Sequence, residues 1–330
     1  MYLEKIQSPE DVKKLDVEQL KVLAGEMRQA LIQKLSVHGG HVGPNLGMVE
    51  ATIAMHYVFD SPKDKMVFDV SHQSYCHKML TGRADAFLDE AKYDDVSGYS
   101  EPSESAHDFF CIGHTSTSVS LACGLAKARD LADENYNVIA VIGDGSLSGG
   151  EALEGLDFAK ELNGNLIVVV NDNEMSIAEN HGGLYENLKL LRDTKGQAEC
   201  NLFKAMGLNY VFVEDGNDLE QLINAFKKVK DSKEPVAVHI HTLKGKGYAL
   251  AEENKESWHW HMPFHIETGE TKGSFDGGED YGTLTADYLL QKMKEDASVV
   301  AITSATPTVF GFTKDKREQA GRQFVDVGIA

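Results

Sequence analysis

Two short polar sequences follow strand-sized apolar runs and could together hold a metal ion. Gly143-Asp144-Gly145 comes directly after the run 138–142, and Asn171-Asp172-Asn173 comes directly after the run 166–170. Asp144 and Asn173 are 29 positions apart (173 − 144), which fits one strand–helix–strand unit. In a parallel sheet both turns would leave the carboxyl edge, where such folds bind ligands. A carboxylate and an amide oxygen placed there suit a hard cation such as Mg²⁺.

A diphosphate is the natural third partner of such a site. Mg²⁺ keeps few protein ligands and completes its octahedron with water and substrate phosphates. The glycines beside Asp144 let the backbone approach a diphosphate, and a helix opening near Gly149 would aim amide groups at it. The alternative is that both sequences are simple turns, since they are rich in residues that tolerate positive φ. Their paired placement after two buried strands favours the metal site.

The net negative charge of the chain favours a metal ion as the partner of a bound phosphate. Its 330 residues include 32 basic and 52 acidic side chains, so the net charge is −20. This argues against binding to nucleic acid or to an anionic membrane, because both require a basic surface. An acidic protein that handles phosphates needs a metal ion, helix N-termini and a few placed cations.

Other global features indicate a cytoplasmic protein. No apolar run approaches the ~20 residues of a membrane span, and the charged N-terminus lacks the apolar segment of a secretory signal. The four cysteines are far apart and form no CxxC pair, which fits reduced thiols that serve as packing residues.

Apolar strands that alternate with helices predict a doubly wound α/β fold. Strands that are apolar throughout indicate a mostly parallel sheet with helices on both faces. The first helix should begin at Asp16, an N-cap with Gln19 three residues later. Strands are expected at 66–70, 138–142, 166–170, 210–213, 236–240, 299–302 and 324–327, and further helices at 45–57, 115–132, 149–162, 218–230 and 284–294.

Residues 249–282 interrupt this alternation and predict a linker. The segment is polar and Gly-rich, with a Trp- and His-rich patch at 258–264. We therefore expect an α/β domain at 1–248, a linker at 249–282 and the start of a second α/β domain at 283–330. The 48 residues after the linker (330 − 282) are too few for a second complete core.

At this point the chain resembles the thiamine diphosphate enzymes, whose signature is GDG followed 25–30 residues later by an asparagine. More narrowly, it is similar to the 1-deoxy-D-xylulose-5-phosphate synthase family, which is related to transketolase. The matching sequences are Gly40-His41 with Leu46-Gly47, 68–78 with 80–83, 113–118, 143–145, 171–177, Lys244-Gly-Lys-Gly-Tyr248 and 326–330. They are ordered along nearly the whole chain.

The resemblance implies a role for each matching residue. Mg²⁺ would be held by Asp144, the Asn173 side chain and the Met175 carbonyl. The diphosphate would be bound by Gly145, Ser146 and His72, and the rest of the cofactor would be contacted by Gly113, His114, Thr115 and Tyr248. The two α/β domains would be a diphosphate-binding domain and the start of a pyrimidine-binding, transketolase-like domain.

Two histidines would face the reacting carbonyl groups by the same resemblance. His41 and His259 would transfer protons or orient substrate, because histidine exchanges protons near neutral pH. His259 is preferred to His261 only by its distance from Tyr248, so a shift of two residues stays open. The other interpretation, packing or surface residues, is preferred for His38, His56, His77, His239 and His241.

The implied activity is the decarboxylation of pyruvate and transfer of the two-carbon unit to glyceraldehyde 3-phosphate, in isoprenoid and thiamine biosynthesis. Substrates would be a 2-oxo acid and a sugar phosphate, and the enzyme would be a homodimer. Two alternatives are another transketolase-like activity and a cofactor-binding subunit without turnover. Departures at Gly98–Pro102 and Trp258–Phe264 concern the substrate rather than the cofactor.

The end of the chain limits the expected activity. In the family a glutamate that activates the aminopyrimidine follows Val-Gly-Ile-Ala, which here occupies 327–330. We therefore expect this polypeptide alone to be inactive or nearly so. Three interpretations fit: a truncated chain, which we favour, a true subunit completed by another chain, or a longer enzyme of which this is one part.

Overall fold

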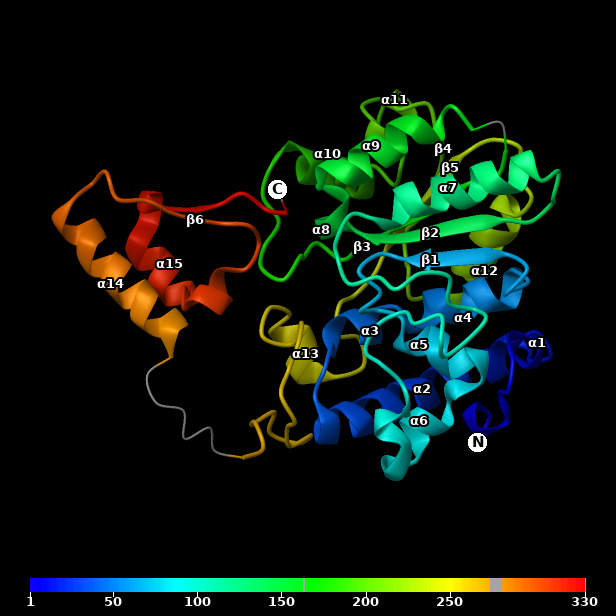
Figure 1. Cartoon of the computed structure of the whole chain (residues 1–330), viewed down its shortest axis with the longest axis horizontal. Helices are drawn as coiled ribbons and strands as arrows, with labels where there is room; N and C mark the ends of the chain where they lie inside the picture. Colours follow the sequence, from blue (N-terminus) through cyan, green and yellow to red (C-terminus); the bar gives the residue numbers. More distant parts are fainter. Residues whose placement is uncertain (163, 274–279, 330) are drawn as a thin grey trace.

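The computed structural model describes residues 1–162, 164–273 and 280–329. Residues 274–279 of the expected linker and Ala330 of the last matching sequence lie outside the described residues. Figure 1 shows a central sheet between two layers of helices, with a smaller unit beside it.

Five parallel strands form the central sheet in the order β1-β2-β3-β5-β4. Each strand coincides within one or two residues with an expected one, because continuous apolar runs are buried on both sheet faces. The predicted parallel α/β fold is confirmed. The strands are β1 (Lys65–Phe68), β2 (Val138–Gly143), β3 (Ile167–Asp172), β4 (Asn209–Val213) and β5 (Val236–His241).

Alternate side chains of each strand enter two separate cores. In β3, Ile167 and Val169 pack with one set of helices, whereas Val168 and Val170 pack with the other. The first core is covered by α2 (Val17–His38), α4 (Val49–Val58) and α12 (Leu219–Val229). The second is covered by α7 (Ser118–Leu131), α9 (Gly150–Ala159), α10 (Gly183–Asp193) and α11 (Leu202–Ala205).

The structure confirms the expected N-cap of the first long helix and divides another expected helix in two. Asp16 caps α2: its Oδ1 accepts from the Gln19 amide at 2.9 Å, and the Gln19 side chain accepts from the Asp16 amide. The helix expected at 45–57 is two helices, because Met48 leaves the helical conformation. The remaining elements of this domain are η1 (Leu3–Lys5), α1 (Pro9–Val12), α3 (Gly43–Gly47), α5 (Tyr75–Lys78), η2 (Met79–Arg83), α6 (Asp85–Leu88), η3 (Glu90–Asp95), α8 (Asp144–Leu147) and α13 (Ala249–Glu253).

The described part of the expected linker packs closely on the first domain. Trp258 and Phe264 are buried in the first core, and His261 forms an isolated β-bridge with Gly40. Packing of this kind fixes the aromatic residues against α2. The domain boundaries themselves stay a prediction.

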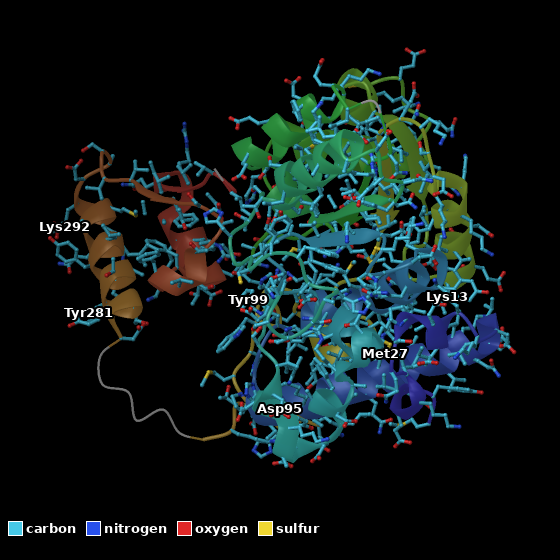
Figure 2. The ribbon with its side chains drawn as sticks, turned by 45° about the vertical axis from the view of Figure 1, so that its right-hand side comes forward. Lys13, Met27, Asp95, Tyr99, Tyr281 and Lys292 are labelled. Carbon is cyan, nitrogen blue, oxygen red and sulfur yellow. The ribbon has the colours of Figure 1, made fainter. Side chains whose placement is uncertain are left out.

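A second, smaller unit follows residue 280. Its β6 (Ala301–Thr303) and β7 (Phe324–Asp326) form a two-stranded parallel sheet. Its helices are α14 (Tyr281–Glu295), η4 (Pro307–Phe310), α15 (Lys314–Ala320) and η5 (Gly321–Gln323). Figure 2 shows Tyr281 and Lys292 on α14, on the outer side of this unit. Arg317 of α15 connects it to the first domain, with hydrogen bonds of 3.1 and 3.0 Å to the Glu256 carboxylate.

The structure shows the exposure of the four cysteines and the character of the helices. Cys76 and Cys123 are buried, whereas Cys111 and Cys200 are exposed and so are not packing residues; all four are free thiols. Of the helices in the described part of the chain, none has both the length and the apolar character needed to cross a membrane.

Candidate functional site

A pocket of about 570 Å³ opens at the carboxyl edge of β2 and β3. It collects residues from segments far apart in the sequence, including the three loops expected to hold a cofactor. Ten of the twelve predicted site residues line it: His41, His72, His114, Thr115, Asp144, Gly145, Ser146, Asn173, Met175 and His259.

Adjacent strands bring the two polar turns together. Gly143 at the end of β2 pairs with Asn171 in β3, so Asp144 and Asn173 leave the sheet at nearly the same level. Asp144 begins α8, and its Oδ1 accepts a hydrogen bond from the Gly145 amide at 2.8 Å. Asn173 Oδ1 accepts from the Met175 amide at 3.2 Å, which folds the 173–175 turn back toward the pocket.

Burial and a neighbouring carboxylate make a bound cation favourable at Asp144. Its side chain is 2% exposed, and burial, followed by repulsion from Asp172, raises its pKa well above the usual range. Asp172 is itself held ionised: burial opposes this, but His239 and Arg192 lower its pKa to about 2. A divalent cation on Asp144 would remove the cost of a second buried carboxylate beside Asp172.

The residues present fit a metal ion that is shared with a diphosphate. The described residues contain no group of three or more His, Cys, Asp or Glu that could hold a metal alone. A metal at Asp144 would therefore depend on amide, carbonyl and ligand oxygens, as is usual for Mg²⁺.

The glycines of this loop keep space free near Asp144. A Cβ at Gly145 would lie 2.2 Å from Ser176 Oγ, and one at Gly149 would lie 2.0 Å from Ser116 Oγ. Only glycine allows the chain to pass this closely beside the pocket.

Three histidine rings meet in one wall of the pocket. The His41 ring centroid lies 4.9 Å from that of His72 and 5.6 Å from that of His259, and the His72 and His259 centroids are 5.3 Å apart. The Nδ1 atoms of His72 and His259 are buried without a hydrogen-bond partner. Unsatisfied buried nitrogens of this kind indicate a missing polar ligand.

All three histidines are neutral at pH 7. Burial, with a smaller effect of Lys244, lowers the pKa of His41 to about 4. Burial also lowers the pKa values of His72 and His259 well below the usual range. The sequence suggested exchange of protons near neutrality, but in this pocket the imidazoles are neutral and weakly basic, which suits hydrogen bonds that orient a carbonyl group better than proton transfer.

Two polar residues that the sequence did not single out organise this wall. Asn45 Nδ2 donates to the carbonyls of His41 and His72, both at 2.8 Å, and its Oδ1 accepts from the Tyr75 amide. Asn180 Nδ2 donates to Asp144 Oδ2 at 2.9 Å. Asn45 gave no signal of this role in the sequence, because at the start of the expected helix 45–57 an asparagine is an ordinary capping residue.

Lys244 is the cation of the pocket. It is 1% exposed, its Nζ donates to the Ser176 carbonyl at 2.6 Å, and burial lowers its pKa to about 7. It belongs to the Lys244–Tyr248 sequence, in which only Tyr248 had been given a role. The pocket thus contains one lysine that can balance negative charge on a ligand.

Two predicted residues do not line the pocket. Gly113 is exposed and precedes the lining residues His114 and Thr115. Tyr248 is buried against Trp258, with ring centroids 4.9 Å apart, and its hydroxyl donates to the Ile266 carbonyl at 2.8 Å.

The choice between His259 and His261 depends on the aromatic cluster beside the pocket. His261 stacks on Trp258 with ring centroids 4.3 Å apart, and it is absent from the pocket wall. His259 lies in that wall. The position of His259 agrees with the residue chosen from the sequence, whereas its role stays a prediction.

Most other histidines have local partners. His56 and His77 form a buried pair that continues to Asp108 at 3.0 Å, and His239 contacts Asp172 at 2.8 Å. Two further histidines pair with surface carboxylates, His38 with Asp94 and His241 with Glu174.

The second unit also reaches this pocket. Ser304, Ala305, Thr306 and Ile329 contribute to its lining. The pocket therefore lies where residues of both units meet at the carboxyl edge of the main sheet.

Comparisons with known proteins identify the family of the chain. The family model described as 1-deoxy-D-xylulose-5-phosphate synthase matches residues 3–201 and 189–242. A synthase of this name from Geobacter sulfurreducens is 42% identical over 99% of the chain, and one from Brevibacillus brevis is 42% identical over 100%. The chain spans 57% and 58% of the length of these two relatives.

Solved transketolases share the fold at low sequence identity. The transketolase of Campylobacter jejuni has a TM-score of 0.61 at 17% identity and matches 93% of this chain and 46% of its own. That of Leishmania mexicana has a TM-score of 0.58 at 15% identity and matches 94% of this chain and 60% of its own. The fold is therefore transketolase-like, and the sequence matches show that the chain belongs to the 1-deoxy-D-xylulose-5-phosphate synthase family.

Proposed function

We propose that this chain is the Mg²⁺- and thiamine diphosphate-binding part of a 1-deoxy-D-xylulose-5-phosphate synthase-like transferase. The observation that carries the proposal is the buried Asp144 carboxylate, which lies beside Asn173 in a glycine-lined pocket. Burial and repulsion from Asp172 raise the pKa of this carboxyl group, which supports a bound cation as its partner.

The pocket residues divide into two groups in this proposal. Asp144, the Asn173 amide oxygen and the Met175 carbonyl hold Mg²⁺. Gly145, Ser146 and His72 bind the diphosphate, with His114 and Thr115 beside the rest of the cofactor. Gly113 and Tyr248 are not included, because neither lines the pocket.

The proposed reaction joins pyruvate and glyceraldehyde 3-phosphate to give 1-deoxy-D-xylulose 5-phosphate and CO₂. Bound thiamine diphosphate supplies a nucleophilic carbon that makes loss of CO₂ from a 2-oxo acid possible. The neutral imidazoles of His41 and His259 orient the substrate carbonyl and hydroxyl groups by hydrogen bonding. The apolar walls exclude water, and Lys244 balances negative charge.

The activity is proposed for a protein that includes more than residues 1–330. The relatives that bear the synthase name are chains of which this one spans 57% and 58%. We propose that the polypeptide 1–330 binds the cofactor with little turnover, and that turnover needs further residues, in a homodimer or from a complementing chain.

Calorimetric titration of thiamine diphosphate in the presence of Mg²⁺ tests the proposal. The protein should bind the cofactor only when Mg²⁺ is present. Asp144→Ala should weaken binding by at least about 100-fold, or about 2.7 kcal/mol, because the carboxylate is the only charged protein ligand of the proposed metal set. Asp157→Ala, an exposed carboxylate on α9, is the matched control.

Two outcomes would contradict the proposal. Equal cofactor affinity in Asp144→Ala and the parent would remove Asp144 from the metal site. Binding that is independent of Mg²⁺ would show that the metal does not hold the diphosphate.

A further inference from the structure

A second cavity lies beside the proposed active site. It has a volume of about 210 Å³ and shares His41 with the larger pocket. Its walls are mostly apolar or aromatic, from Leu35, Tyr75, Phe87 and Val96, and it contains Lys34 of α2. We call it the Lys34 cavity. It is much larger than the roughly 15 Å³ that a single water molecule requires.

Lys34 is a buried cation without a carboxylate partner. It is 5% exposed, and no ion pair joins it to a carboxylate in the part of the chain that the structure describes. Its Nζ donates to the carbonyls of Ala86 and Tyr93 at 2.9 and 2.8 Å and lies 4.4 Å from the Phe87 ring centroid. An ammonium group has three hydrogens to donate, so one remains for another acceptor.

Two of the three acidic residues whose charges act on Lys34 are engaged elsewhere. Asp94 contacts His38 at 2.6 Å, and the Glu104 carboxylate receives hydrogen bonds from Lys78 and from Arg83. Burial, together with repulsion from Lys78, lowers the pKa of Lys34 to about 8. Lys34 is therefore still mainly charged at pH 7, and among the described residues no carboxylate lies within ion-pair distance of this buried charge.

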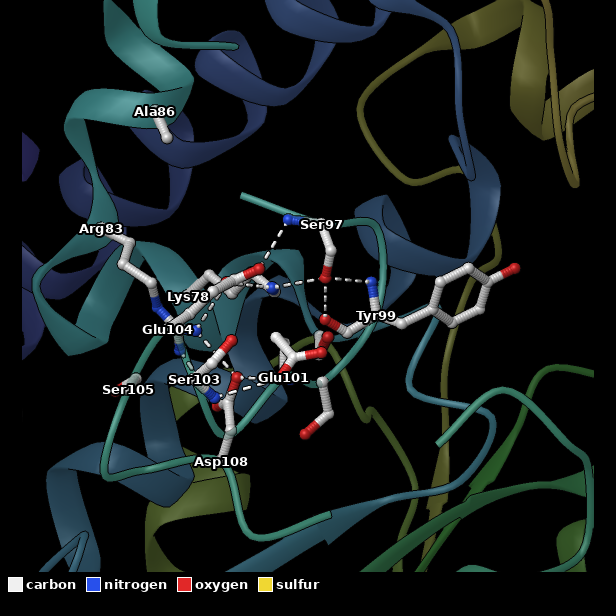
Figure 3. A network of polar contacts seen from close by, with 12 residues as sticks. Lys78, Arg83, Ala86, Ser97, Tyr99, Glu101, Ser103, Glu104, Ser105 and Asp108 are labelled. Atoms are coloured by element: carbon white, nitrogen blue, oxygen red, sulfur yellow. Dashed lines mark hydrogen bonds and ion pairs between the residues drawn. The ribbon is translucent and has the colours of Figure 1, made fainter. Parts of the chain in front are cut away.

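The segment that contributes Ser97, Gly98 and Tyr99 to the cavity is held in place by buried ion pairs. Figure 3 shows Lys78 and Arg83 meeting Glu104, and Arg83 continuing to Asp108. These carboxylates accept hydrogen bonds from the backbone of the next segment: Glu104 from the Ser97 amide at 2.7 Å, and Asp108 from the Glu101 amide at 3.0 Å. The cavity is therefore preformed.

Two aromatic side chains form the rim. Tyr99 and Trp260 both line the cavity and are 40% and 50% exposed. The Tyr99 ring centroid lies 6.0 Å from that of His41, on the side where the two pockets meet. A ligand in the cavity would thus contact an amphipathic rim and approach His41.

We infer that the Lys34 cavity binds a small aliphatic monocarboxylate, with its carboxylate on Lys34 Nζ and its carbon chain against the apolar wall. One lysine balances one negative charge. A phosphate dianion would keep an uncompensated charge in an apolar cavity, which is costly. This site is separate from the proposed cofactor site and does not require that the proposed function be correct.

Propionate is a suitable probe, because it is a short monocarboxylate and has no 2-oxo group that could react with a cofactor. Binding can be followed by the fluorescence of Trp260 at the rim. We expect saturable binding of propionate, and binding of inorganic phosphate weaker by at least about tenfold, or about 1.4 kcal/mol. Propionate affinity should be unchanged when thiamine diphosphate and Mg²⁺ fill the larger pocket.

Substitutions at Lys34 and Gly98 test separately the charge of Lys34 and the free volume of the Lys34 cavity. Lys34→Met should weaken propionate binding at least tenfold, whereas Lys34→Arg should retain most of it. Gly98→Leu leaves Lys34 in place but should block the cavity, because a Cβ at Gly98 lies 3.4 Å from the Tyr75 hydroxyl. Lys127→Met, on the exposed side of α7, is the control for loss of one positive charge.

Several results would overturn the inference. These are no saturable propionate binding to the parent protein, phosphate binding at least as tight as propionate binding, and unchanged affinity in both Lys34→Met and Gly98→Leu. Displacement of propionate by thiamine diphosphate would place the carboxylate in the larger pocket instead.

Discussion

At the scale of single residues, burial sets the chemistry of the proposed active site. His41, His72 and His259 lie within 6 Å of one another by ring centroid, and burial lowers the pKa of each. Their neutral state suits hydrogen bonding to a ligand. It also makes the folded protein sensitive to acid, because an unfolded chain binds protons that the folded pocket excludes.

We predict that the free energy of unfolding decreases as the pH is lowered from about 6.5 to about 4. Below 6.5 a histidine in the unfolded chain is protonated, whereas His41 stays neutral in the folded protein until about pH 4. Each such histidine contributes up to about 1.4 kcal/mol per pH unit to this slope. Urea unfolding of the ligand-free protein at several pH values measures it.

His41→Asn should make the slope smaller, since it removes one group that protonates only on unfolding. The control is His265→Asn, which changes an exposed histidine and should leave the slope as in the parent. An identical slope in His41→Asn and the parent would show that His41 is not held neutral by the fold.

At the scale of elements, the site depends on how α8 passes the 173–180 segment. Gly145 in the first turn of α8 approaches Ser176, whose carbonyl accepts from Lys244 and whose hydroxyl contacts Asn180 Oδ1 at 2.6 Å. Asn180 in turn donates to Asp144. One close contact therefore connects the helix, the loop and the proposed metal ligand.

Gly145→Ala should disturb all of these contacts. The added Cβ would lie 2.2 Å from Ser176 Oγ and 3.2 Å from its Cα, so the loop must move. We predict a loss of about 1–3 kcal/mol in stability, as for other overpacked sites, together with weaker binding of thiamine diphosphate. Thermal unfolding and calorimetric titration measure the two effects.

The matched control is Gly124→Ala in α7, which does not line the pocket and where an added Cβ meets no heavy atom within 4 Å. It should preserve cofactor affinity and should not lower stability. If Gly145→Ala behaved in the same way, the close approach of α8 to the loop would not matter for binding.

At the scale of the whole molecule, exposed apolar side chains concentrate on the second unit. Ile302 is 69% exposed, Val309 66% and Phe310 57%, and α14 exposes Tyr281 and Tyr288. The core of this unit is small, with Ala286, Leu290, Met293, Phe312 and Ala320. Exposed apolar side chains gathered on so small a unit favour an interaction surface there.

We predict that the polypeptide 1–330 associates through this surface. Sedimentation velocity should show a weight-average sedimentation coefficient that rises with protein concentration. The double variant Ile302→Lys/Phe310→Lys should reduce the rise, whereas Leu131→Lys, a single exposed apolar residue at the end of α7, should not. Equal association of the parent and the double variant would exclude this surface.

The amino-acid sequence by itself determined the fold class and the placement of Asp144 and Asn173 at one edge of the sheet. Continuous apolar runs are buried on both faces of a sheet, so they are recognisable as parallel strands without knowledge of their neighbours. Asp144 and Asn173 were predictable for the same reason: each immediately follows such a strand, and chain connectivity places both at one edge.

Only the tertiary structure decided which histidine faces the pocket, where Lys244 points, and that Lys34 occupies a cavity. These depend on contacts between segments far apart in the sequence, such as the stacking of His261 on Trp258 that leaves His259 at the pocket. The position of Tyr248 was not apparent from its sequence, because its burial depends on an aromatic cluster assembled after the last strand of the sheet. Local patterns specify what a residue follows along the chain, whereas burial, and with it the pKa of a side chain, is set by what packs against it.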